Sequence, residues 1–196
     1  MKALKKTLLL FLFSFPWFIL EAQQLEDSFY CDIASVKDSI YLPHCFVIAD
    51  SDKVLQPASA LQQKWSSLSE LVKEKRLPKN WIPGKVFLLV NLSSSHGSAD
   101  TVYFYPGLVY SSIKTFNVTE GKLTLLNDLS RADGYQPLAL PAKAKRQFLF
   151  ELTPSKTIFN TIAPQIIQND FFEEYKKRNY YRETSQQSVG YPFSGL

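Results

Sequence analysis

The sequence has few residues of the kinds that perform acid–base chemistry or hold metal ions. Its 196 residues include two histidines, His44 and His96, and two cysteines, Cys31 and Cys45. It has no GxGxxG or Walker loop, no HExxH zinc motif and no GxSxG nucleophile turn. His96 stands in the polar stretch SSSHGS, which is typical of a solvated loop. We therefore expect no enzymatic activity, no catalytic residues, no cofactor and no metal site.

The sequence also lacks a strong charge of one sign. It has 22 Lys and Arg against 18 Asp and Glu, for a formal net charge of +4. The first 22 residues hold three of the lysines and one glutamate, so the net charge of the remainder is about +2 and is scattered. A nucleic-acid-binding surface needs a denser basic patch than this. We expect no nucleic-acid partner.

The longest apolar run is at the N-terminus. Lysines precede an apolar stretch over residues 7–20, and Ala22 offers a small residue for cleavage. This three-part pattern predicts a signal peptide over residues 1–22 and export of the protein. A membrane anchor is the alternative, but the run is shorter than the ~20 residues of a spanning helix and contains Pro16.

Export favours a disulfide between Cys31 and Cys45, because oxidising compartments stabilise paired cysteines. The bond would close a loop of about 15 residues. Two unpaired buried thiols are one alternative. A metal site with His44 is another, for which the sequence offers neither a CxxC pair nor a clear fourth ligand.

Short β-branched and aromatic runs dominate the chain from Trp81 onward. Loops containing Gly, Pro, Asn, Asp and Ser separate them at intervals of about ten residues, which predicts an antiparallel β-sandwich or barrel. The stretch Val86–Val90 is continuously apolar, so we expect a central strand buried on both faces. Three shorter β-like runs precede it, at residues 29–33, 39–42 and 45–48.

Two helices are expected beside the strands. Pro57 suits a first helical turn, and an apolar stripe at spacings of four, three and four predicts an amphipathic helix over about 57–77; its members are Leu61, Trp65, Leu68 and Val72. Such a stripe can hold a partner, but packing onto a sheet is the commoner use.

The second helix is expected at Phe171–Arg182, after an Asp170 N-cap with Glu173 as its capping-box partner. The pairs Glu173–Lys177 and Glu174–Arg178 have favourable spacing, whereas the apolar stripe lasts one turn. These features indicate a connector helix within residues 169–196, with a polar tail that has no apolar run of about 18 residues. A solvated helix without further purpose is the alternative.

The stretch TVYFYPGLVY is the best candidate for ligand contact. Tyr103 and Tyr105 share one face of a strand, and Tyr110 follows close by. Tyrosines stack on sugars and other flat-faced ligands while their hydroxyls stay in water. The alternative is that these rings fill the space between strands.

From Ile40 to Arg182 the chain resembles a bacterial family, the extracellular sensory region of seven-transmembrane receptors with diverse intracellular signalling modules, many of them histidine kinases. The segments that carry the resemblance are, in order, SIYLPHCFVIADSD, NWIPGKVFLLVNLSSS, ADTVYFYPG, YQPLALPAKAKRQFLFEL and FFEEYKKRNYYRE. The last of these is similar to the lead-in to the family's first membrane helix. The resemblance concerns architecture and role and assigns no ligand residues.

The resemblance implies a jelly-roll-like β-sandwich over residues 23–168 that binds a small, carbohydrate-like ligand and signals to a membrane module. It implies a location in the periplasm or on the cell-envelope face of the inner membrane. A sensor domain of a signalling receptor, such as a two-component system uses, is thus the expected function. A freestanding secreted carbohydrate-binding module is the first alternative, and a structural domain that docks another envelope protein is the second.

Overall fold

The fold is mainly β, as the sequence predicts. The computed structural model describes residues 29–42, 44–50, 52–74, 84–107, 110–130, 134–154 and 162–189. The expected signal peptide lies outside these residues. Within them the chain forms a seven-stranded sheet and a four-stranded sheet, with antiparallel pairing except between β1 and β5.

The larger sheet has the order β4-β3-β5-β10-β7-β8, and β1 pairs with β5 beside this path. Its strands are β1 (Cys31–Asp32), β3 (Phe46–Asp50), β4 (Ser66–Ser67), β5 (Lys85–Ser93), β7 (Tyr110–Thr119), β8 (Lys122–Ser130) and β10 (Lys145–Pro154). The smaller sheet has the order β2-β11-β6-β9. Its strands are β2 (Ser39–Tyr41), β6 (Asp100–Tyr105), β9 (Gln136–Leu140) and β11 (Gln165–Gln168).

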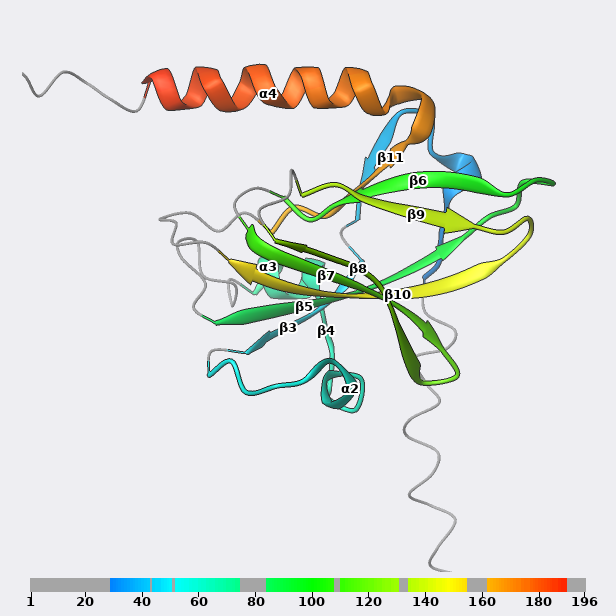
Figure 1. The fold of residues 1–196 in the computed structure, drawn as a ribbon, viewed down its shortest axis with the longest axis vertical. Helices are drawn as coiled ribbons and strands as arrows, with labels where there is room; N and C mark the ends of the chain where they lie inside the picture. Colours follow the sequence, from blue (N-terminus) through cyan, green and yellow to red (C-terminus); the bar gives the residue numbers. More distant parts are fainter. Residues whose placement is uncertain are drawn as a thin grey trace, which may run out of the picture.

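Short helices and one long helix complete the described part of the chain. They are η1 (Ile33–Ser35), α2 (Pro57–Ala60), α3 (Leu68–Lys73), η2 (Asn169–Phe171) and α4 (Phe172–Val189). Figure 1 shows the layers: α4 lies over the smaller sheet, the two sheets face each other, and α2 lies beyond the larger sheet. None of these helices combines the length and the apolar character required to cross a membrane.

The main core lies between the two sheets. Val86, Leu88 and Phe150 of the larger sheet pack with Val102 and Phe104 of the smaller sheet. The rings of Phe104 and Phe150 stack across the interface, with their centroids 3.9 Å apart. This face-to-face packing is that of a β-sandwich, whereas the jelly-roll connectivity stays a prediction.

Strand β5 is buried on both faces, which confirms the prediction from its continuous apolar run. Its even-numbered residues face the main core, and Phe87 and Leu89 belong to a second cluster on the opposite face. The second cluster includes Ala60, Trp65 and Leu149. The α2 segment therefore covers the outer face of the larger sheet, as Figure 1 shows.

The prediction of one amphipathic helix over 57–77 is wrong. The structure has α2, then the short strand β4, then α3. Trp65 packs in the outer cluster, whereas Leu68 packs in the main core on the other side of the sheet. A continuous helix places these two residues on one face, so the chain leaves the helical conformation to pass the edge of β3.

Candidate functional site

Sequence-based reasoning favoured Tyr103, Tyr105 and Tyr110 as ligand contacts, and the structure separates them. Tyr103 and Tyr105 do share the outer face of β6, as their spacing predicts, but the start of α4 contacts them there. Tyr110 lies on β7 of the other sheet and packs against the main core. The three rings do not form one binding surface.

The tyrosines of β6 instead hold the C-terminal helix. The ring of Tyr103 stacks on Phe172, with centroids 3.6 Å apart and planes 4° apart. Tyr105 stacks on Tyr135 at 4.7 Å, and Tyr135 meets Phe172 and Tyr175 edge-on. We call Tyr103, Tyr105, Tyr135, Phe172 and Tyr175 the helix-docking cluster. The Tyr105–Tyr135 stack and the edge-on contacts of Tyr135 have geometries that aromatic pairs favour, whereas Tyr103 and Phe172 lie nearly face to face.

Two hydrogen bonds reinforce this attachment. The Tyr175 hydroxyl donates to Gln165 Oε1 at 2.8 Å, and Asn179 Nδ2 donates to the Tyr135 hydroxyl at 3.1 Å. Gly134 makes the position of Tyr135 possible, because its φ of +84° suits glycine and an added Cβ would lie 3.2 Å from the Tyr105 ring.

The helix differs from its prediction at both ends. Asp170 lies within η2 rather than at an N-cap, and α4 continues to Val189 rather than ending at Arg182. The predicted ion pair between Glu174 and Arg178 does form. Tyr180 is 66% exposed, whereas Phe172, Tyr175 and Asn179 of the first two turns contact the sandwich.

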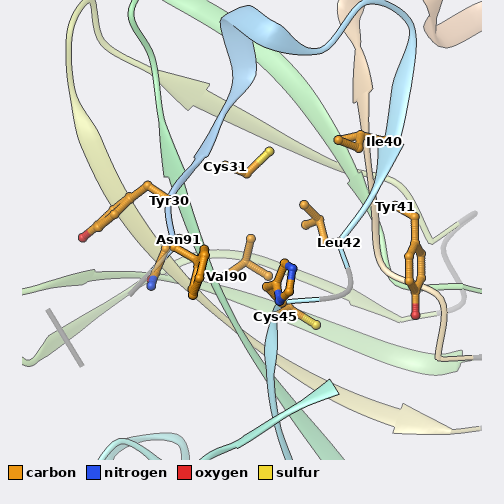
Figure 2. Close-up of a pocket in the computed structure, with 10 residues that line it drawn as sticks. Tyr30, Cys31, Ile40, Tyr41, Leu42, Cys45, Val90 and Asn91 are labelled. Carbon is orange, nitrogen blue, oxygen red and sulfur yellow. The ribbon is translucent and has the colours of Figure 1, made fainter. Parts of the chain in front are cut away.

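A small cavity opens at the edge of β5, where its two neighbours on that side meet. Strand β3 pairs with Lys85–Leu89, and β1 pairs with Leu92 and Ser93. Val90 and Asn91, which lie between the two pairings, line a cavity of about 150 Å³. We call it the thiol cavity; its lining, part of which is labelled in Figure 2, is Phe29, Tyr30, Cys31, Ile40, Tyr41, Leu42, His44, Cys45, Val90 and Asn91.

The structure has Cys31 and Cys45, for which the sequence predicts a disulfide, as two free cysteines. Cys31 pairs with Leu92, and Cys45 precedes the residue that pairs with Leu89. The two cysteines thus lie about two residues apart along β5, or ~7 Å, at the upper limit for a disulfide. In Figure 2 their sulfur atoms do not point toward one another.

Burial keeps both thiols protonated. It raises the pKa of Cys45 to about 12. It also raises the pKa of Cys31, and the negative charge of the neighbouring Asp32 adds to this shift. Asp32 itself accepts hydrogen bonds from Ser95 and Ala34, which lower its pKa and hold β1 near the end of β5.

A second, more polar hollow lies on the outer face of the larger sheet, with a volume of about 390 Å³. We call it the outer groove; its lining is Tyr30, Leu61, Trp65, Leu89, Val118, Thr119, Glu120, Gly121, Lys145, Arg146 and Gln147. Trp65 and Leu89 are among its apolar residues. Lys145 Nζ lies 4.9 Å from the centroid of the Tyr30 ring, a cation–π geometry.

One side of the outer groove is the tight turn between β7 and β8. Glu120 and Gly121 have φ values of +50° and +71°, as a two-residue type I′ hairpin requires. Glycine adopts this conformation freely, whereas Glu120 is strained there. The turn therefore places Glu120 in the lining of the outer groove, which also includes Lys145 and Arg146.

Sequence-based reasoning missed most of both hollows. Tyr30, Trp65 and Lys145 are far apart along the chain and come together only through strand pairing. Among the residues that line the thiol cavity, the sequence indicates only Cys31, Cys45 and His44 as candidate site residues. No protein-family model matches this chain, and neither does any curated protein.

The thiol pKa shifts give a first testable prediction. A pKa of about 12 leaves roughly one Cys45 in 10⁵ as thiolate at pH 7, so a maleimide should modify Cys45 very slowly in the native protein. The rate should rise with pH, and Cys31 should react first because it is less buried. In denaturant both thiols should react fully. A linked Cys31–Cys45 peptide in a non-reducing map would contradict this.

The helix-docking cluster gives a second prediction. Phe172→Ala removes the ring that stacks on Tyr103, and should cost about 1–3 kcal/mol of the attachment of α4. Hydrogen exchange over 169–180 should accelerate more than in Phe171→Ala, whose ring contacts Tyr175 and Arg178 of the helix itself. Equal exchange in the two variants would show that the stack does not hold the helix.

Proposed function

We propose that this chain is the extracytoplasmic sensory domain of a membrane signalling receptor. In this role the sandwich binds a small, carbohydrate-like ligand and α4 relays the binding to a membrane signalling module. The observation that carries the proposal is the attachment of α4, which the helix-docking cluster fixes to the sandwich through its first two turns and which continues to Val189. A helix attached at one end can transmit a movement of the strands to which it is attached.

The outer groove is the proposed ligand site. Its volume of about 390 Å³ lies within the range of small-molecule pockets. It offers the aromatic rings of Tyr30 and Trp65 beside the side chains of Arg146 and Gln147. Sugars present both apolar ring faces and hydroxyl groups, and a lining of this mixed kind suits them.

A freestanding secreted carbohydrate-binding module is the second candidate. The position of the outer groove favours it, because the groove lies on the larger sheet whereas α4 packs on the smaller one. Such a module needs the groove alone. The two candidates therefore differ in whether a ligand in the groove changes α4.

Sugar binding is tested by thermal shift across a panel of mono- and disaccharides. A sugar that binds should raise the melting temperature by roughly 3–5 °C at ten times its Kd. Lys145→Ala and Arg146→Ala should each weaken binding about tenfold by removing a charged hydrogen-bond donor. Lys37→Ala removes an exposed lysine outside the groove and should leave binding unchanged. A panel without any stabilising sugar would exclude both candidates.

The relay is tested by hydrogen exchange of the α4 backbone with and without the sugar identified in that panel. A sensor should show altered exchange over 172–189, because a ligand shifts α4 only if it binds two positions of the helix with different affinity. A binding module should show altered exchange around the outer groove and unchanged exchange in α4. That second result would replace the sensor with the module.

A further inference from the structure

We propose that the thiol cavity is a second binding site, which takes a small uncharged ligand with a single aromatic ring. This site is separate from the outer groove and from the carbohydrate-like ligand proposed there. Three properties of the cavity support the assignment: its size, a lining without Asp, Glu, Lys or Arg, and the aromatic pair beside it.

The volume matches one ring. Protein interiors contain few voids larger than a water molecule. The thiol cavity, with a volume of about 150 Å³ beside the core, is large enough to hold a small ligand. An apolar cavity of about this volume in another protein binds benzene. Pockets for larger ligands begin at about 300 Å³. The thiol cavity is thus suited to one ring and too small for a disaccharide.

The lining is largely apolar, with His44 and Asn91 as its nitrogen-bearing side chains. Ile40, Leu42 and Val90 supply aliphatic carbon, and the ten lining residues include no Asp, Glu, Lys or Arg. Both thiols stay protonated at neutral pH because burial raises their pKa. A charged ligand would lose its hydration in this cavity without gaining a carboxylate, lysine or arginine as an ion-pair partner. An uncharged ring loses little on leaving water and gains apolar contact.

An aromatic pair stands beside the cavity. Phe29 stacks on His44 with the ring centroids 5.0 Å apart. Phe29 is 73% exposed and has a φ of +38°, which is uncommon for a bulky residue. The structure therefore keeps an exposed ring at the cavity despite a cost in backbone conformation and solvation. A ring-shaped ligand could meet this pair in the edge-on or offset geometry that aromatics favour.

The test is a titration of the purified protein with toluene and phenol, followed by calorimetry or NMR. For ligands of about seven heavy atoms we expect a dissociation constant on the order of 1 mM. Benzoate, which has the same ring and a negative charge, should bind at least tenfold more weakly. Glucose should not compete with toluene, since its proposed site is the outer groove.

Two variants at one position provide the matched control. Cys31→Leu fills the cavity and should weaken toluene binding at least tenfold, with an unchanged or higher melting temperature. Cys31→Ala enlarges the cavity and removes the same thiol, and should retain binding within about threefold. If Cys31→Leu does not fold, Ile40→Phe fills the cavity from strand β2, where the side chain is 41% exposed.

Three results would overturn the proposal. The first is no binding by the wild-type protein of phenol up to 10 mM, about tenfold above the expected Kd, and of toluene up to its solubility. The second is equal toluene affinity in the wild-type protein and in a folded variant that fills the cavity, Cys31→Leu or Ile40→Phe. The third is loss of binding in Cys31→Ala, which would assign the effect to the thiol rather than to the cavity. None of these bears on the sugar panel, so the proposed function is tested independently.

Discussion

The structure depends on the burial of strand β5 on both faces. Its residues Val86–Val90 are at most 3% exposed, so each face needs its own cover. The smaller sheet covers one face, and the α2 segment with Trp65 covers the other. Burial of this much apolar surface is the dominant stabilising contribution in a domain of this size. The other layers of the sandwich follow from that requirement.

The edge of β5 explains where the two hollows lie. On one side β10 pairs along nearly the whole strand, but on the other β3 and β1 share the edge, and the thiol cavity opens between them. Asn91, at this junction, accepts a hydrogen bond of 2.9 Å from Gln147, which lines the outer groove. Tyr30 lines both hollows. The two hollows are thus neighbours: they share the Tyr30 ring, and a hydrogen bond links Asn91 of one to Gln147 of the other.

Local sequence patterns predicted most of the strands. They failed where contacts between distant segments of the chain decide the structure. The run Val86–Val90 could be recognised because burial on both faces leaves a continuous apolar stretch. The apolar stripe that includes Trp65 and Leu68 led to the wrong prediction of a single helix. Helical spacing does not reveal that the chain crosses a sheet edge between these two residues. The shared face of Tyr103 and Tyr105 was predicted correctly, but Phe172 covers it from nearly 70 positions away. No sequence pattern near Tyr103 and Tyr105 indicates that a distant segment covers them.

The relay that we propose from the outer groove to α4 would have to cross the sandwich, since the groove and the helix lie on different sheets. The main core provides two links between the sheets. Phe104 and Phe150 stack across it, and Thr115 Oγ1 donates to Gln136 Oε1 at 3.0 Å, where both residues are fully buried. A buried hydrogen bond has no water to replace it, so the two sheets are held in one register at this point. Gln136 follows Tyr135, whose ring contacts Phe172 of α4. In the proposed relay, a displacement of β7, which leads to the groove turn at Glu120, would reach the base of α4 through Thr115 and Gln136.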